Sequence, residues 1–333
     1  MMKHNFVNLT RMSSAARRLE WLDLFRGFAV LGMVWTHAAN TFLDSSLQAT
    51  SWYGELSYYH GLIAPALFWI AGFVRAHVTA GKTKPAWPAM KRLLMVLLIG
   101  YLMHVPWQAL FDAKAWRAAC TVNVLHCLAI SGMLMLLAER CGRWRDAVAA
   151  GLMVFFVALQ TSAESWHTGV LFIDQYFNRN HGSWFALFPW VGFGLAGFLT
   201  RHLFWNGTMG PGSWIVAALG GLLAFAQPYS PWPGGAPEFF FERLGWVMIA
   251  AVAVAAMAGV VSRLTAWLRL AGRESLLLYV AHLLLIHAIP MPRQPLQHLI
   301  GMTQPVWSVV LIFLALFAAS LGLGWLNERR KAR

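Results

Sequence analysis

Apolar segments of about 18 to 23 residues follow one another along most of this 333-residue chain, separated by short groups of charged, Pro and Gly residues. As a helix, a segment of that length spans the roughly 30 Å hydrocarbon core of a bilayer. Only helices and closed barrels satisfy every backbone polar group there, and these segments show no alternation with a period of two. The composition agrees, since 59% of the residues are hydrophobic and only 12% are charged. The sequence therefore predicts an all-α, polytopic integral membrane helix bundle.

Ten membrane-spanning helices are predicted from the apolar segments. We expect them at about residues 22–44, 57–80, 92–111, 121–139, 147–161, 185–200, 213–227, 240–262, 274–290 and 305–326. With the N-terminus inside, 20 of the 26 Lys and Arg residues fall on the inner side. Because basic residues concentrate in cytoplasmic loops, both termini are predicted to be cytoplasmic. Residues 1–20 then form a cytoplasmic segment, 21–327 a transmembrane domain and 328–333 a basic cytoplasmic tail.

The basic excess is read as a signal of topology. In a soluble protein a net charge of +13 would suggest a nucleic-acid partner, provided that the basic residues gathered on one exposed face. Here they follow the predicted inner loops, so we expect no nucleic-acid partner, with polybasic binding of lipid or nucleotide as the lesser alternative. The first apolar segment is too long for a signal peptide and carries Asp23 and Arg26, so we expect it to be retained.

Polar residues in the first span are the main functional candidates, because an ionisable group inside a bilayer is costly unless it is paired or faces a cavity. The spacing of four of them places all four on one stripe of a helix: Asp23, Arg26, His37 and Asn40. His37 is expected about 16 Å from Arg26 along the axis, near the middle of the membrane. Asp23 and Arg26 equally suit an ion pair three residues apart. For His37 a hydrogen bond to a neighbouring helix is the alternative, and its depth in the membrane favours a functional role.

Other histidines lie on later spans. His282 follows Arg273 by nine residues, about 13 Å of helix, so it is expected at the depth of His37. Four more are placed nearer the outer face, where they form either a polar vestibule or isolated interfacial residues: His60, His104, His126 and His287. No pair has metal-site spacing with a third ligand, and the three cysteines add none, so we predict no metal.

Five short stretches carry a resemblance to a known family. They are Leu22 to Gly27 (LDLFRG) with Met33 and a polar residue at position 37, residues 64–72 (APALFWIAG), 123–128 (NVLHCL), 188–193 (FPWVGF), and the Ser, Tyr and His pattern of 275–282. Together they resemble the transmembrane acyltransferase superfamily, and within it the bacterial heparan-alpha-glucosaminide N-acetyltransferase-like family. The resemblance extends from about residue 20 to residue 290.

This resemblance implies a multi-pass protein of the bacterial inner membrane with about ten or more helices. Such proteins take an acyl group, usually acetyl, from cytosolic acyl-coenzyme A and deliver it to a sugar or glycan amine or hydroxyl on the far side. In the sugar N-acetyltransferase itself, the position corresponding to His37 looks like asparagine and the catalytic histidine lies later. His60 therefore enters as a second candidate base.

The leading hypothesis is a membrane acyltransferase in which a histidine takes a proton from the acceptor. An imidazole suits this role because its ordinary pKa of about 6.5 lies near working pH. The candidate catalytic residues are His37, His282, Asn40 and His60. Residues expected to hold acyl-coenzyme A, the only co-substrate predicted, are Arg26, Asp23 and Arg273, together with inner basic loops.

Two other classes of function stay open at this point. A transporter or exporter of a lipid-linked or acidic solute would use His37, His282 and Arg26 as a relay. The third hypothesis is a scaffold subunit without chemistry. The expected partners are the lipid bilayer and a sugar or glycan acceptor, with a homodimer as one option for assembly.

Overall fold

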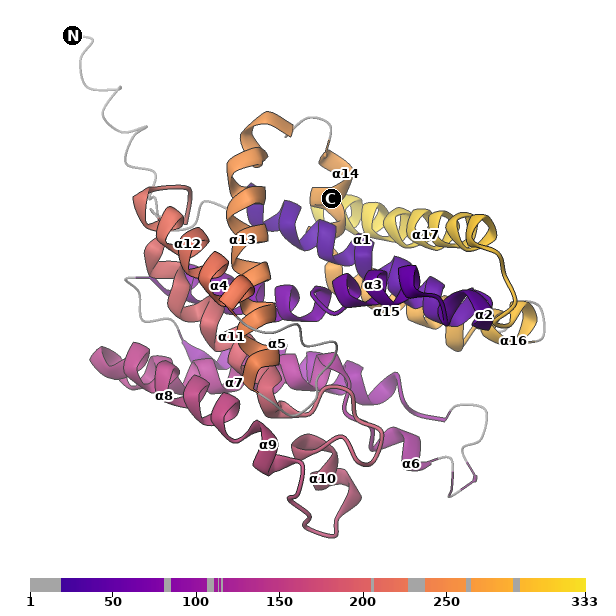
Figure 1. Cartoon of the computed structure of the whole chain (residues 1–333), viewed down its shortest axis with the longest axis horizontal. Coiled ribbons are helices and arrows are strands. Elements are labelled where there is room, and N and C mark those ends of the chain that lie inside the picture. The colour runs from indigo at the N-terminus through magenta and orange to yellow at the C-terminus, as the bar shows by residue number, and fades with distance from the viewer. Residues whose placement is uncertain are drawn as a thin grey trace.

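The computed structural model describes residues 19–80, 85–106, 111, 112, 114, 116–204, 207–226, 237–261, 265–289 and 294–333. Every regular element in these ranges is a helix, which confirms the all-α prediction (Figure 1). The helices are α1 (Glu20–Phe42), α2 (Ser45–Gln48), α3 (Ser51–His60), α4 (Ile63–Thr79), α5 (Ala86–Leu102), α6 (Trp116–Ala119), α7 (Val124–Arg140), η2 (Gly142–Trp144), α8 (Arg145–Ala158), α9 (Gln160–Ala163), α10 (Leu171–Phe177), α11 (Leu187–Thr200), η3 (Arg201–Leu203), α12 (Pro211–Ala226), α13 (Pro237–Val261), α14 (Ala266–Arg273), α15 (Ser275–His287), α16 (Leu296–Ile300) and α17 (Val306–Ala332).

The described helices support a membrane bundle. Three helical stretches are long and apolar enough to cross a bilayer: Ser51–Thr79, Pro237–Gly259 and Val306–Ala332. The pair α14 and α15, bent by 83°, would make a fourth if it forms one span. Several other helices are shorter than a full crossing, with 17 residues in α5 and α7 and 14 in α8 and α11. Ten spans therefore remain a prediction.

Apolar side chains cover the outside of the bundle as well as its interior. Large hydrophobic residues are exposed along α5, α8, α12 and α17, among them Leu98, Val154, Leu222 and Leu311, each more than half exposed. Apolar surface of this extent needs a cover other than water, and lipid provides it. Composition and structure thus agree on a protein that lives in a membrane.

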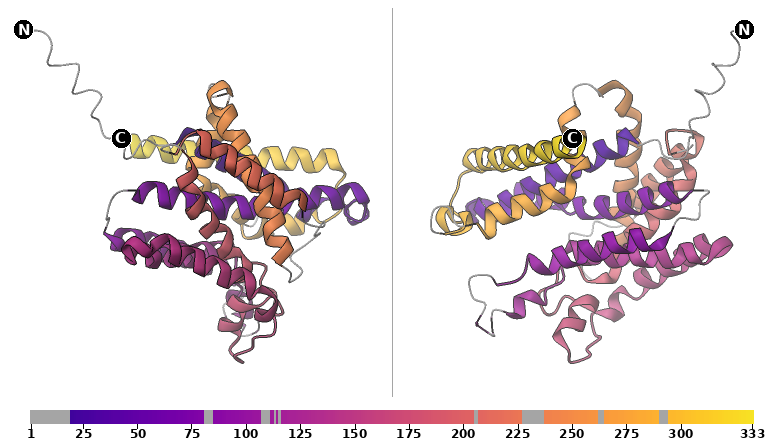
Figure 2. Two further views of the ribbon diagram at one scale, coloured as in Figure 1. Left: turned by 60° about the vertical axis from the view of Figure 1, so that its left-hand side comes forward. Right: turned by 180° about the vertical axis from the view of Figure 1, so that it is seen from behind.

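The two ends of α17 lie at opposite ends of the bundle. Its start is joined to the end of α1, because the Asp44 backbone N–H donates to the Gln304 carbonyl and the Gln304 N–H donates to the Phe42 carbonyl, both at 2.9 Å. Its C-terminus lies at the other end of the bundle, where α4 ends and α5 begins (Figure 2, left). The helix continues to Ala332, so the predicted tail 328–333 lies almost wholly within it.

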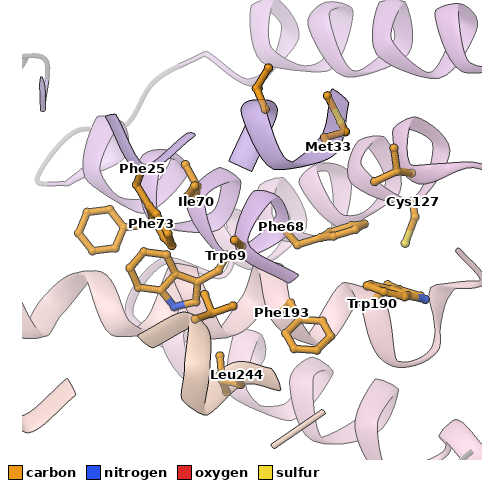
Figure 3. Packing of buried hydrophobic residues seen from close by; sticks show 14 of the residues in the cluster. Phe25, Met33, Phe68, Trp69, Ile70, Phe73, Cys127, Trp190, Phe193 and Leu244 are labelled. Carbon is orange, nitrogen blue, oxygen red and sulfur yellow. The ribbon is translucent and has the colours of Figure 1, made fainter. Parts of the chain in front are cut away.

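Aromatic residues and glycines dominate the core where α4 crosses α11 (Figure 3). The Trp69 and Phe73 rings lie 5.1 Å apart, and Phe73 meets Phe204 at 5.0 Å. A Cβ atom at Gly197 would lie only 1.9 Å from the Trp69 carbonyl oxygen, so the two backbones are in direct contact. Gly194 and Gly197 therefore serve close helix packing.

The predicted orientation can be tested with single cysteines in a cysteine-free background. Arg143→Cys lies in the exposed turn between α7 and α8, and Asn180→Cys lies in the loop after α10. Because the positive-inside rule assigns these loops to opposite sides, a membrane-impermeant maleimide added from the periplasm should label position 180 and spare position 143 until the membrane is lysed. Labelling of position 143 in sealed cells would reverse the topology.

Candidate active site

Three adjoining cavities follow one face of α1. The arginine cavity, of about 570 Å³, is lined by Arg26, Arg75 and Arg92. The central cavity, of about 600 Å³, is lined by His37, Asn40 and His60. The histidine cavity, of about 570 Å³, is lined by His37, Asn40, His104 and His287. Arginines thus lie at one end of the series and histidines at the other.

Shared lining residues join the three cavities. Met33 and Tyr279 line both the arginine cavity and the central cavity. His37, Asn40 and Tyr279 line both the central cavity and the histidine cavity. Three of the four residues of the stripe predicted in the first span therefore line these cavities, with Arg26 at one end and His37 and Asn40 where two cavities meet.

Two of the predicted donor-binding residues lie away from the cavity walls. Asp23 is 7% exposed at the contact between α1 and α14, where its carbonyl oxygen would be 1.8 Å from a Cβ atom at Gly272. Arg273 forms an ion pair with Glu328 of α17, with Nη2 2.7 Å from Oε2. The adjacent Glu274 accepts hydrogen bonds from Asn327 and Lys331. Arg273 therefore belongs to a polar cluster that holds the end of α17 against the bend between α14 and α15.

His37 and His282 come from different helices and meet at the centre of the series. Their ring centroids are 5.2 Å apart. His282 is fully buried, and its Nδ1 lies 2.6 Å from the Leu278 carbonyl oxygen, so Nδ1 carries the proton in the neutral ring. Its Nε2 atom is buried without a hydrogen-bond partner in the described part of the chain. His37 is the member of the pair that faces the cavities, and His282 lies behind it.

A second polar group lines the central cavity. The Tyr53 hydroxyl donates to Asn40 Oδ1 at 2.5 Å, which leaves the Asn40 amide nitrogen as a donor. The His60 ring lies 6.2 Å from the Tyr53 ring, and both of its nitrogens are buried without a hydrogen-bond partner among the described residues. α3 thus brings Tyr53 and His60 to the Asn40 side of the cavity.

The arginine cavity has a fixed basic wall. Arg75 forms a two-point ion pair with Glu139 of α7, in which Arg75 Nε lies 2.7 Å from Oε1. Thr79 donates to the same carboxylate at 3.0 Å. Arg92 lies on the exposed face of the neighbouring α5. Sequence alone places Arg75 and Arg92 only among the basic residues of the inner side, because it does not reveal that α4 and α5 border the same cavity as Arg26 of α1.

The outer histidines divide into two groups. His60, His104 and His287 line cavities, as a polar vestibule requires. His126 is fully buried instead, and its Nδ1 accepts the Asn123 backbone N–H at 3.1 Å while the Asn123 side chain caps the start of α7. His126 is therefore a capping residue, which its position three residues after Asn123 at a helix start could have indicated.

A known protein family matches more than half of this chain. The model of the family described as heparan-alpha-glucosaminide N-acetyltransferase, catalytic, matches residues 18–225. The chain belongs to this family. No curated protein matches the sequence. The family match includes α1, α3, α4 and α5, and so it covers Arg26, His37 and His60; it ends before α15, which supplies Tyr279 and His282. The resemblance found in the sequence is confirmed, and the protein is a membrane protein of the acetyltransferase type.

Proposed function

We propose that this protein moves an acetyl or other small acyl group from cytosolic acyl-coenzyme A to a sugar amine or hydroxyl that enters from the other side of the membrane. One observation carries the proposal: His37 lies between an arginine-lined cavity and a cavity lined by histidine and aromatic residues. A donor and an acceptor arriving from opposite ends would meet at this imidazole. The family assignment favours this chemistry over solute transport or a scaffold role.

The donor would enter at the arginine cavity. Guanidinium groups match the geometry of phosphate oxygens, and Arg26 and Arg92 line this cavity beside the ion-paired Arg75. Beyond them the lining is mainly apolar, with Val30, Met33 and Leu67, which suits an extended thioester arm. The helical rise from Arg26 to His37, about 16 Å, separates the nucleotide from the reacting carbonyl.

At the centre, His37 would act as the general base. Its imidazole takes the proton from the acceptor amine or hydroxyl as the nitrogen or oxygen attacks the thioester carbonyl. A new C–N or C–O bond forms, the C–S bond breaks, and the thiolate leaves with coenzyme A. The Asn40 amide nitrogen can donate to the developing oxyanion, because the Tyr53 hydroxyl already occupies Asn40 Oδ1.

His282 would position His37 without touching the substrate. Its hydrogen bond to Leu278 fixes the ring, so that its unpartnered Nε2 atom is the one available to the neighbouring imidazole. A base that is itself oriented by a third group is the usual arrangement for proton transfer. The acceptor would lie in the histidine cavity, where Trp184, Phe185 and Trp190 provide flat apolar surfaces and Asn123 provides an amide.

Substitution of Arg26 tests the donor half of the proposal. Arg26→Gln should weaken acetyl-coenzyme A binding by about 10- to 150-fold, because one charge-assisted contact to phosphate contributes about 1.5 to 3 kcal/mol. Acceptor KM should change little, since Arg26 lies in the cavity farthest from the acceptor. Titration calorimetry of the detergent-purified protein measures the first quantity and radiolabelled acetyl transfer the second.

Two arginine variants serve as controls. Arg273→Gln removes the ion pair with Glu328 outside the cavity, so it should lower the melting temperature and leave donor affinity unchanged. Arg117→Gln, on an exposed face of α6, should alter neither. If the folded Arg26→Gln variant binds acetyl-coenzyme A as tightly as the unmodified protein does, the donor does not bind in the arginine cavity.

A further inference from the structure

The loop between α9 and α11 brings together three side chains that metal ions favour. His167 precedes α10, Asp174 lies within it and His181 follows it. One ligand atom from each residue lies within 4.8 Å of those of the other two. The two imidazole rings have centroids 5.9 Å apart and their planes are inclined by 77°.

The segment that carries these residues is held by its own hydrogen bonds. Asp174 Oδ1 accepts from both the backbone N–H and the hydroxyl of Thr168, each at 2.7 Å. The Gln175 amide donates to the His181 carbonyl oxygen at 2.8 Å. The Asn178 amide donates to the Trp166 carbonyl oxygen at 2.7 Å, which ties together the two stretches that hold the histidines. A loop fixed in this way presents its three ligand groups with little further ordering.

We infer that His167, Asp174 and His181 form a binding site for a divalent transition metal, with Zn²⁺ as the ion that fits best. Two imidazoles and one carboxylate suit Zn²⁺ and other divalent first-row transition metals, whereas Ca²⁺ and Mg²⁺ prefer six or more oxygen ligands. Three protein ligands leave a fourth tetrahedral position for water, and the exposure of both histidines gives water access to it. Asp174, which is 3% exposed, supplies the negative charge.

This site is separate from the proposed acyl-transfer centre, and it lies on the segment that leads into the histidine cavity. Figure 1 shows α9 and α10 at the lower end of the molecule, beyond α8. Two residues after His181, Ser183 accepts the Val122 N–H at 3.0 Å, and Trp184 and Phe185 then line the histidine cavity. A bound ion would therefore stabilise the segment next to the histidine cavity, which the acceptor is proposed to enter. This gain in stability can be measured without measuring turnover.

Zn²⁺ binding to the purified full chain, with affinity tags removed and EDTA dialysed away, tests the inference. Calorimetry should show one Zn²⁺ per chain, and ZnCl₂ should raise the melting temperature because it binds only the folded loop. Co²⁺ in its place should give visible d–d absorption. Loss of an outer-shell partner already costs 10- to 100-fold in metal affinity, so His167→Gln or His181→Gln should cost at least about 100-fold.

Controls separate this site from general histidine binding. Both histidines are exposed, so their Gln variants should have the melting temperature of the unmodified protein in EDTA. His202→Gln alters another exposed histidine, one that lies 3.4 Å from the Asp146 carboxylate, and should leave Zn²⁺ affinity unchanged. Thr168→Val removes one of the two hydrogen bonds from Thr168 to Asp174 and should weaken Zn²⁺ binding by about 10-fold, the lower end of the range for an outer-shell partner. Binding that survives in His167→Gln and His181→Gln, or no stoichiometric binding at all, would overturn the inference.

Discussion

His37→Gln should lower the rate of acetyl transfer by roughly 10² to 10⁴-fold, while acetyl-coenzyme A affinity and melting temperature stay close to those of the unmodified protein. The loss follows from removing the group that accepts the proton in the transition state. Donor affinity should persist because the proposed phosphate contacts lie in the arginine cavity, about 16 Å away along α1. Single-turnover transfer from radiolabelled donor, with calorimetry and thermal unfolding on the same samples, measures all three quantities.

His282→Gln and His60→Gln belong in the same experiment. His282 lines none of the three cavities described above. Its variant should therefore lose less turnover than His37→Gln and keep the acceptor KM of the unmodified protein. His60 lines the central cavity beside Tyr53 and has no ring contact with the His37 and His282 pair among those the structure describes, so we expect its effect mainly in acceptor KM. Collapse of turnover in His60→Gln with near-normal turnover in His37→Gln would transfer the catalytic role to His60.

A purely structural role for His37 predicts the opposite pattern. An interhelical hydrogen bond in a membrane bundle contributes about 0.6 to 2 kcal/mol to stability. In that case the melting temperature of His37→Gln would fall, and the activity of the fraction that remains folded would be normal. Measuring turnover per folded molecule, with the folded fraction taken from gel filtration, distinguishes the two roles.

The site on α1 was largely predictable because a single helix has a known period. Residues 3 and 11 positions apart lie on nearly the same side, so the spacing of Arg26, His37 and Asn40 is enough to place them along one wall. The meeting of His37 with His282 was expected only as a shared depth. Whether two helices at one depth face each other depends on packing, and one sequence does not contain that information.

Contacts between distant parts of the chain are harder to predict for the same reason. Arg273 was assigned to the donor because it precedes α15 on the basic side, but its partner Glu328 lies 55 positions further along the chain. Arg75 and Arg92 reach the arginine cavity from α4 and α5, which no local spacing reveals. The sequence predicts no metal, and the proposed cluster of His167, Asp174 and His181 is not evident from it, because a separation of seven residues across a loop has no regular geometry.

The helical stretches were placed more reliably than the number of crossings. α1, Glu20–Phe42, lies within two residues of the predicted 22–44, because the start and end of a long apolar run are plain in the sequence. The predicted span 57–80 coincides with the second part of the helical stretch Ser51–Thr79, which is long and apolar enough to cross a bilayer but contains a turn at 61–62 between α3 and α4. Hydropathy measures apolar length, and it does not detect a turn between two apolar helices.

Gly72→Ala should have the largest effect on folding. A Cβ atom at position 72 would lie 1.8 Å from the Gly194 carbonyl oxygen and 2.8 Å from the Phe198 backbone nitrogen. Those are backbone atoms of α11 and cannot rotate aside, so α4 and α11 would have to separate. Overpacking usually costs about 1 to 3 kcal/mol, and we expect this contact to exceed that range, because Gly197 makes the same close approach to Trp69 from the other helix.

The consequence should extend to activity, because both helices also line the central cavity. Leu67 is contributed by α4 and Trp190 by α11, so separating these helices would widen the space around His37. Thermal unfolding in detergent and acetyl transfer should therefore fall together in Gly72→Ala, unlike in His37→Gln. Gly151→Ala is the matched control, since a Cβ atom at that position on α8 has no neighbour within 4 Å and should be tolerated. Equal melting temperatures for the two variants would mean that α4 and α11 are not in backbone contact.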